Sequence, residues 1–244
     1  GYIPIEPGLV AAQRVTEYID NLEQEAPHEM EGAAIELLRR HENGVKDSHI
    51  PLMESTMDYF IPEMLDAFLV RTVDAIGLSS MPTKVVHSTA DVIGKTAKML
   101  VPHLLKKRSN KELEPMIGFV DEIYIRPEQA DNGLASTGCE IDQATYERMK
   151  RVVAGIQAGE VQANRAELSE LMSLTVDIML EGFMKRAINL LKHGFVVRKI
   201  ADGAIATCQA AGHGVVNKVF KKLDDEQMLH LANYFDTLIL SAQR

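Results

Sequence analysis

Tryptophan is absent from this 244-residue chain, and aromatic residues together make up only 5% of it. Aromatic side chains favour β-strands, so their scarcity shifts the expectation towards a helical protein. Methionine, which is unbranched and compatible with helices, occurs 12 times. The hydrophobic fraction of 46% and the charged fraction of 25% are ordinary for a soluble globular protein. The composition therefore indicates a helical fold with a substantial apolar core.

Cysteine and long apolar runs are also scarce. The two cysteines, Cys139 in a predicted loop and Cys208 in a predicted helix, show no zinc-binding spacing. Two thiols far apart in the sequence indicate a reducing compartment, so we expect a cytoplasmic protein. No run approaches the roughly 18 uncharged apolar residues of a membrane span, and the sequence shows no secretory signal. The sequence thus predicts a soluble protein without a membrane span.

An excess of positive charge is missing as well. The chain has 26 lysine and arginine residues against 35 aspartate and glutamate residues, which gives a formal net charge of −9. An acidic surface repels phosphate backbones, so the composition argues against nucleic-acid binding. The longest basic run, Lys106-Lys107-Arg108, follows a predicted helix, where cations interact favourably with the negative end of the helix dipole. We therefore interpret this run as a helix end.

Apolar residues recur with the helical period along most of the chain. The segment 48–76 is the clearest case, and Pro62 inside it should kink the helix because proline lacks an amide donor. Asn43-Gly44 predicts the end of one helix, and Asp224 predicts the start of another. We find no convincing strand. The predicted helices cover residues 9–24, 29–41, 48–76, 83–105, 111–124, 141–156, 165–191, 196–222 and 225–242.

The second half of the sequence resembles a worn copy of the first. With a shift of 115, residues 106–125 (KKRSNKELEPMIGFVDEIYI) align with residues 221–240 (KKLDDEQMLHLANYFDTLIL). With a shift of 119, the preceding long helices align, for example Thr56 with Thr175. The difference in shift places an insertion in a connector, where insertions are tolerated. Amphipathic helices share an apolar period and always align somewhat, but the common helix order and lengths favour duplication.

These patterns predict an all-α fold made of two tandem four-helix-bundle-like repeats, related by approximate two-fold symmetry, plus an N-terminal helix. We expect an N-terminal arm and helix at residues 1–27, the first repeat at 28–126, a linker at 127–139 and the second repeat at 140–244. Each repeat would bury its apolar faces by packing its helices antiparallel through short loops.

Methionine stripes and helical glycines mark the candidate ligand-binding surface. Met57, Met64 and Met179 are most simply core residues, but methionines also form adaptable apolar grooves for a partner helix or a lipid-like molecule. Gly212 and Gly214 lie inside a predicted helix, where two glycines cost about 2 kcal/mol relative to alanine. Another helix or a ligand should therefore approach closely there. We predict these five residues as a ligand-binding site between the repeats.

Titratable residues on two matching helices give a second hypothesis. His87 and Asp91 lie four residues apart on one predicted helix, so they share a face. With the shift of 115, His87 aligns with Asp202, and Lys98 aligns with His213. A metal site formed by His87, Asp91, Asp202 and His213 would make the protein a metal-dependent helical-bundle enzyme. A polar stripe facing water explains the same pattern.

A third and weaker hypothesis concerns His87 alone. Histidine phosphotransfer modules are four-helix bundles with an exposed helical histidine, and the sequence HSTA starts at this residue. The lysine and glycine that usually follow such a histidine are replaced by Ala90 and Asp91. The resemblance is therefore restricted to the histidine and its predicted helix.

The leading functional hypothesis combines what is missing with what is duplicated. The sequence contains no complete catalytic motif, but its repeated amphipathic helices are rich in methionine. We therefore expect a non-catalytic regulatory or adaptor protein that binds a partner helix or a small apolar ligand between its repeats. The sequence identifies no cofactor, leaves open whether the protein is an enzyme, and leaves a homodimer open as its oligomeric state.

Overall fold

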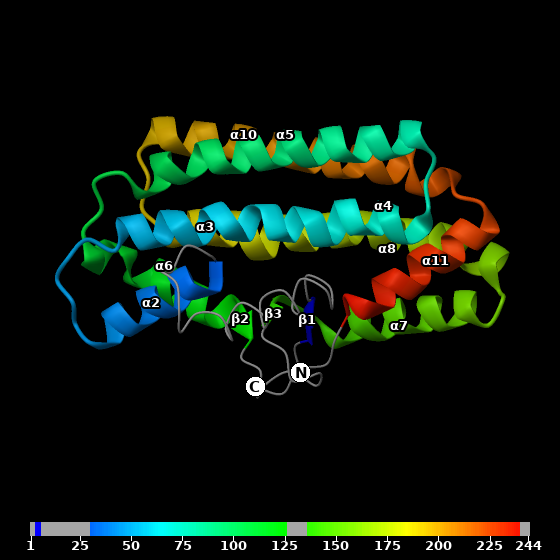
Figure 1. The fold of residues 1–244 in the computed structure, drawn as a ribbon, viewed down its shortest axis with the longest axis horizontal. Coiled ribbons are helices and arrows are strands. Elements are labelled where there is room, and N and C mark those ends of the chain that lie inside the picture. The colour runs from blue at the N-terminus through cyan, green and yellow to red at the C-terminus, as the bar shows by residue number, and fades with distance from the viewer. Residues whose placement is uncertain (1–2, 6–29, 126–135, 240–244) are drawn as a thin grey trace.

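The computed structural model describes residues 3–5, 30–125 and 136–239 and is an all-α fold (Figure 1). Residues 30–125, the first half, contain α2 (Met30–Glu42), a long helix made of α3 (Ile50–Leu65), η1 (Asp66–Val70) and α4 (Arg71–Ile76), then α5 (Ser80–Leu105) and α6 (Asn110–Ile123). Residues 136–239, the second half, contain α7 (Gln143–Gln157), a long helix made of α8 (Val161–Met179), η3 (Leu180–Lys185) and α9 (Arg186–Leu190), then α10 (Phe195–Lys218), the short turn η4 (Phe220–Lys222) and α11 (Asp225–Thr237). The predicted helix 9–24 and most of the predicted linker lie outside the described residues.

The described residues include four short strands that the sequence did not predict, and one pair of them joins distant parts of the chain. β1 (Ile3–Ile5) pairs antiparallel with β4 (Cys139–Ile141), and β2 (Tyr124–Ile125) pairs antiparallel with β3 (Ser136–Thr137). Cys139 therefore lies in a strand and not in the predicted loop. Strands of two or three residues carry too few side chains to produce a recognisable alternating pattern, which explains why the sequence did not reveal them.

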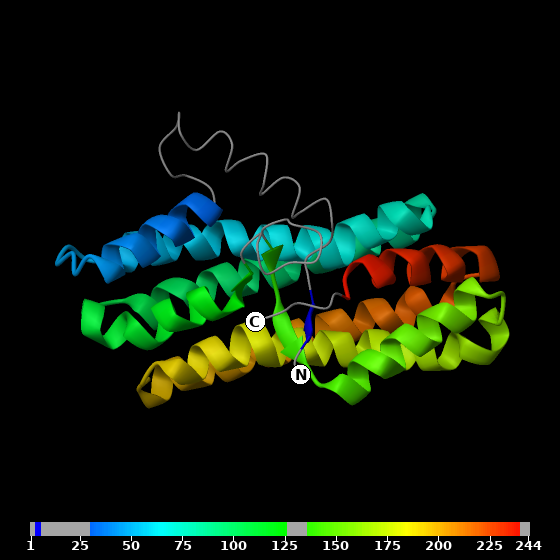
Figure 2. The same ribbon diagram turned by 90° about the horizontal axis from the view of Figure 1, so that it is seen from below.

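The helices are stacked in layers (Figures 1 and 2). α5 and α10 pack side by side in one outer layer. The long helix of each half lies beneath them, with α3 against α5 and α8 against α10. The other outer layer has α2 and α6 at one end of the molecule and α7 and α11 at the other. A single core of buried apolar side chains runs through both halves.

Local sequence signals set the helix ends. Asp224 starts α11 with a capping box, because its carboxylate accepts the Gln227 amide at 2.8 Å while the Gln227 side chain accepts the Asp224 amide at 3.1 Å. This confirms the predicted N-cap. Gly44 follows the end of α2 in the left-handed conformation with φ +63°, which confirms the predicted stop. Most predicted helix boundaries agree with the structure within a few residues.

Both long helices widen into a π-helical segment, η1 in the first half and η3 in the second. The helix continues through Pro62, and η1 begins four residues later. The sequence LEGFMK of η3 contains no proline. Proline is therefore not required for the widening. At Pro62, where the sequence predicts a kink, the helix is not interrupted.

The last helix of each half packs against the long helix of the other half. α6 contacts α9, and α11 contacts α4. The Tyr234 hydroxyl of α11 donates a hydrogen bond of 2.6 Å to the carbonyl of Ala67 in η1. In the other half, the guanidinium of Arg186 lies 5.7 Å from the ring centre of Phe119 in α6. The two halves are therefore joined by reciprocal contacts.

Candidate functional site

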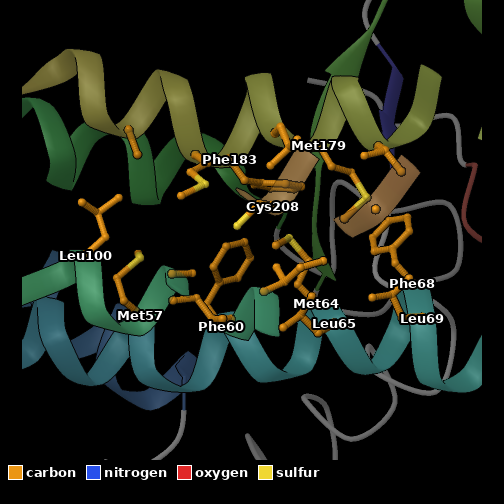
Figure 3. A pocket seen from close by; sticks show the side chains of 18 of the residues that line it. Met57, Phe60, Met64, Leu65, Phe68, Leu69, Leu100, Met179, Phe183 and Cys208 are labelled. Carbon is orange, nitrogen blue, oxygen red and sulfur yellow. The ribbon is translucent and has the colours of Figure 1, made fainter. Parts of the chain in front are cut away.

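An apolar cavity of about 160 Å³ lies between the two halves (Figure 3). Its walls come from the long helix of each half, including both π segments, and from α5 and α10. The close-up shows side chains of α3 and η1 pointing towards those of α8 and η3 across this space. The cavity is thus built jointly by both halves.

The side chains that line the cavity are almost all apolar. Among the described residues that line the cavity, Thr175 and Cys208 alone carry a side-chain hydroxyl or thiol. The Thr175 hydroxyl already donates to the Leu171 carbonyl at 2.8 Å. The cavity therefore offers apolar contacts and no free strong hydrogen-bonding side chain, which suits an apolar occupant.

Aromatic side chains from both halves meet at this cavity. Phe60 of α3 and Phe183 of η3 form an edge contact, with ring centres 5.2 Å apart and an interplanar angle of 61°. Both are labelled in Figure 3, one on each wall of the cavity. Phe68 of η1 also lines the cavity. Because π segments often occur at functional sites, their position against this cavity supports its choice as the candidate site.

Gly212 allows α8 and α10 to approach closely beside the cavity. A Cβ atom at this position would lie 2.7 Å from the Cγ1 atom of Val176. The predicted close approach at Gly212 is therefore present, and its partner is a neighbouring helix. At Gly214, an added Cβ would meet nothing within 4 Å.

A polar cluster joins α8 and α10 one residue beyond this contact. The Asp177 Oδ1 atom accepts hydrogen bonds from Gln209 Nε2 and lies 2.8 Å from His213 Nε2. Burial alone would raise the pKa of the Asp177 carboxyl, but the hydrogen bonds from His213 and Gln209 lower it below its usual value. The carboxylate therefore holds both side chains of α10 against α8.

The two thiols are both buried and free. Burial raises the pKa of Cys208 to about 11 and that of Cys139 to about 12. Thiolates are the reactive form of cysteine, so both residues are poor nucleophiles at neutral pH. Cys208 contributes to the cavity as a small apolar side chain.

The structure brings together most of the ligand-binding residues that the sequence suggested. Met57, Met64, Met179 and Gly212 all line the cavity. Gly214 is not among the lining residues. The methionines come from both long helices, and Figure 3 shows Met64 and Met179 on opposite sides of the space.

The four proposed metal ligands do not converge. His87, Asp91 and Asp202 have exposed side chains, whereas the ring of His213 is hydrogen-bonded to the carboxylate of Asp177. Within residues 30–125 and 136–239, no three histidine, cysteine, aspartate or glutamate side chains gather in a way that could hold a metal ion. The polar-stripe interpretation describes the first three residues better.

Sequence reasoning did not single out the aromatic part of the lining. Phe60, Phe68 and Phe183 have the same helical spacing as any buried apolar residue, so periodicity alone does not separate cavity walls from packed core. A sharper signal lies in the alignment of the two halves of the sequence. Phe68 and Phe183 are 115 residues apart, which is the shift that aligns the later helices.

Comparison with known proteins found no matching family model, no similar curated protein and no similar solved structure. Among the described helices, none combines the length and the apolar character needed to cross a bilayer.

Proposed function

We propose that the two halves are copies of one helical unit, and that the cavity between them binds a small apolar molecule in a non-catalytic, regulatory role. The observation that carries this proposal is the cavity itself, which has an apolar lining drawn from both halves. The methionines expected to form a binding groove, Met57, Met64 and Met179, are among the residues that line it. We propose a small ligand in preference to a partner helix, because the cavity is too small to hold a helix.

Support for duplication comes from the positions of the lining residues. A single shift of 115 carries much of the first half's lining onto the second half's lining. Examples are Met57 onto Met172, Met64 onto Met179 and Phe68 onto Phe183. The same shift relates the starts of α5 and α10, Ser80 and Phe195, and those of α6 and α11, Asn110 and Asp225. The separate shift of 119 for the long helices, and the insertion it implies, are then unnecessary.

The size of the cavity favours a small molecule. An engineered apolar cavity of about 150 Å³ stays dry and binds benzene, and the present cavity of about 160 Å³ is comparable. An α-helix with its side chains is about 10–12 Å in diameter, so a partner helix could not enter without separating the halves. A cavity of this size selects a ligand with few non-hydrogen atoms or one slender chain.

The shape of the cavity favours a slender ligand. Along α3 and η1 the lining extends from Met57 to Leu69. With a rise of 1.5 Å per residue, twelve helical steps correspond to about 18 Å. A linear hydrocarbon chain fills such a long and narrow space better than a compact ring does. Each buried methylene group would contribute about 0.8 kcal/mol.

Ligand binding would favour one packing of the two halves. The ligand contacts both long helices at once, so it stabilises the arrangement in which they face each other. A regulatory protein could report this arrangement to a partner through its outer helices. The expected effect on stability follows from mass action, with about 2.7 kcal/mol gained when the free ligand concentration is 100 times Kd.

The test is a binding measurement with 1-dodecanol, a slender and uncharged probe. We expect saturable binding by isothermal titration calorimetry and a rise in Tm of at least about 5 °C at saturation.

Cys208→Leu extends a side chain into the cavity and should weaken binding about tenfold. The control is Ala210→Leu, an exposed residue of the same helix, which should leave binding unchanged. Ala97→Leu, on the α5 wall, provides an independent way to fill the cavity.

Absence of dodecanol binding to a folded protein would contradict the proposal. Equal binding by the wild type and both filling variants would also contradict it, because the probe would then bind elsewhere. Circular dichroism of each variant separates a lost fold from a filled cavity.

A further inference from the structure

A second pocket, of about 550 Å³, lies between the end of the second long helix and the first part of α10. Its lining differs sharply from that of the apolar cavity. Lys185, Lys192, His193 and Arg198 line it, together with a single carboxylate, Asp202. In a chain with a net charge of −9, such a concentration of cations is a local exception. A pocket lined with one sign of charge attracts ligands of the opposite sign.

Two of these cations are available to a ligand. Within the described part of the chain, neither Lys192 nor Arg198 forms an ion pair, and both have exposed side chains. Lys185 forms one ion pair, with its Nζ atom 3.2 Å from Oε2 of Glu181, four residues earlier on the same helix. Asp202 and Glu181 therefore neutralise only part of the positive charge of the pocket.

The geometry around His193 keeps this ring neutral and fixed. Its Nδ1 atom lies 3.1 Å from Arg108 Nη2, and guanidinium groups only donate, so Nδ1 is the acceptor. The Nε2–H group then donates to the Ile188 carbonyl at 2.8 Å. Burial lowers the pKa of His193, and the charges of Arg108 and Arg198 lower it further. The same positive charges that keep the ring neutral would favour an anion beside it.

The basic pocket and the apolar cavity are neighbours. Ile188 lines both of them. On α10, Cys208 lines the cavity while the next residue, Gln209, lines the basic pocket. The cationic pocket and the apolar cavity therefore adjoin each other at Ile188 and along one stretch of α10.

We infer that the ligand is a single-chain anionic amphiphile, whose hydrocarbon chain occupies the cavity and whose carboxylate or phosphate lies beside Lys192 and Arg198. This inference rests on the proposed apolar binding function and names the ligand class. The cavity has no free polar side chain for a head group, and the basic pocket supplies what the cavity lacks. Ile188 marks the point where the chain passes from one pocket to the other.

The three cations that line the basic pocket have no charged counterparts in the first half. At the shift of 115, Lys185, Lys192 and Arg198 correspond to Val70, Gly77 and Thr83, none of which is charged. Asp202 corresponds to His87. The positions of the first half that correspond to these three cations thus carry no charge, and this difference defines a single orientation for an amphiphile.

The test compares four probes by isothermal titration calorimetry: dodecanoate, dodecyl phosphate, 1-dodecanol and inorganic phosphate. The two anionic chains are used below their critical micelle concentrations, and 1-dodecanol is used below its solubility limit. We expect at least one anionic chain to bind about fivefold or more tightly than 1-dodecanol, and this advantage should shrink at high salt. The double variant Lys192→Gln/Arg198→Gln should reduce the affinity of the anionic chain to that of 1-dodecanol. Lys218→Gln, an exposed lysine at the other end of α10, is the control and should change neither affinity.

The outcomes separate this inference from the proposed function. If 1-dodecanol and both anionic chains bind equally, the inference is overturned while apolar binding stands. If inorganic phosphate binds as tightly as dodecyl phosphate, the basic pocket acts independently of the cavity and the inference is overturned. If no chain binds, the proposed function and the inference fall together. A preference for dodecanoate or for dodecyl phosphate identifies the head group.

Discussion

At the scale of single residues, two glycines of the same helix should affect stability in opposite directions when a methyl group is added to them. Gly212 and Gly203 both lie within α10, where glycine is less favourable than alanine by about 1 kcal/mol. A methyl group on Gly212 would meet a Val176 methyl group at 2.7 Å, whereas one on Gly203 would meet nothing within 4 Å. Valine is stiff at χ1, so its side chain cannot easily move away. Close packing thus outweighs helix propensity at one position only.

This contrast gives a prediction with opposite signs. Gly212→Ala should lower the free energy of unfolding by about 1–3 kcal/mol, because it overpacks the contact between α8 and α10. Gly203→Ala should raise it by about 0.5–1 kcal/mol, because it restricts the unfolded chain and favours the helix. Urea unfolding followed by circular dichroism measures both values. Stabilisation by both substitutions would show that α8 and α10 do not approach closely at Gly212.

At the scale of secondary-structure elements, the π segments are the feature that local sequence signals do not reveal. Helix-forming residues, capping boxes and glycine stops predict where helices begin and end, and those expectations largely agree with the structure. A π segment depends on what packs against the helix, such as Tyr234 against η1. The strand pairs have the same origin, because Ile3 pairs with Ile141 across most of the chain. These elements follow from tertiary contacts that no short window contains.

The hydrogen bond at η1 leads to a prediction about this element. Tyr234→Phe removes the hydroxyl that donates to the Ala67 carbonyl and should cost about 1 kcal/mol, since Ala67 is fully buried. Burial raises the pKa of Tyr234 to about 12, so the hydroxyl stays protonated and able to donate at neutral pH. Hydrogen exchange in residues 66–70 should become faster, because the contact that holds the π segment is lost.

The matched control is Tyr146→Phe on α7. No hydrogen bond joins the Tyr146 hydroxyl to any residue in the described segments, and the ring is only partly buried. This substitution should change stability by less than about 0.5 kcal/mol. If Tyr234→Phe has no larger effect and leaves exchange in residues 66–70 unchanged, then Tyr234 does not support the π segment.

At the scale of the whole molecule, the sequence drew attention to residues that line the apolar cavity but not to the cations that line the basic pocket. Methionines at helical spacing indicated a groove, and the structure places several of them around one cavity. Lys185, Lys192 and Arg198 lie on two helices and the turn between them, and each alone resembles an ordinary surface cation. Only the fold brings them beside the cavity. Charge clusters that form across a turn have no spacing rule comparable to the helical period.

The proposed duplication gives the last prediction, because residues that it makes equivalent around a shared cavity should have similar energetic roles. Met64→Ala and Met179→Ala remove equivalent side chains from opposite walls. Each should lower the free energy of unfolding by about 1–3 kcal/mol, less than for a fully packed methionine because both side chains already border empty space. Both variants should also enlarge the cavity and favour a longer-chain alcohol over 1-dodecanol.

Met81→Ala, at a residue that is 76% exposed, is the control and should change stability by less than about 0.5 kcal/mol. A cost at one wall with none at the other would mean that the halves do not share the cavity as equivalent copies.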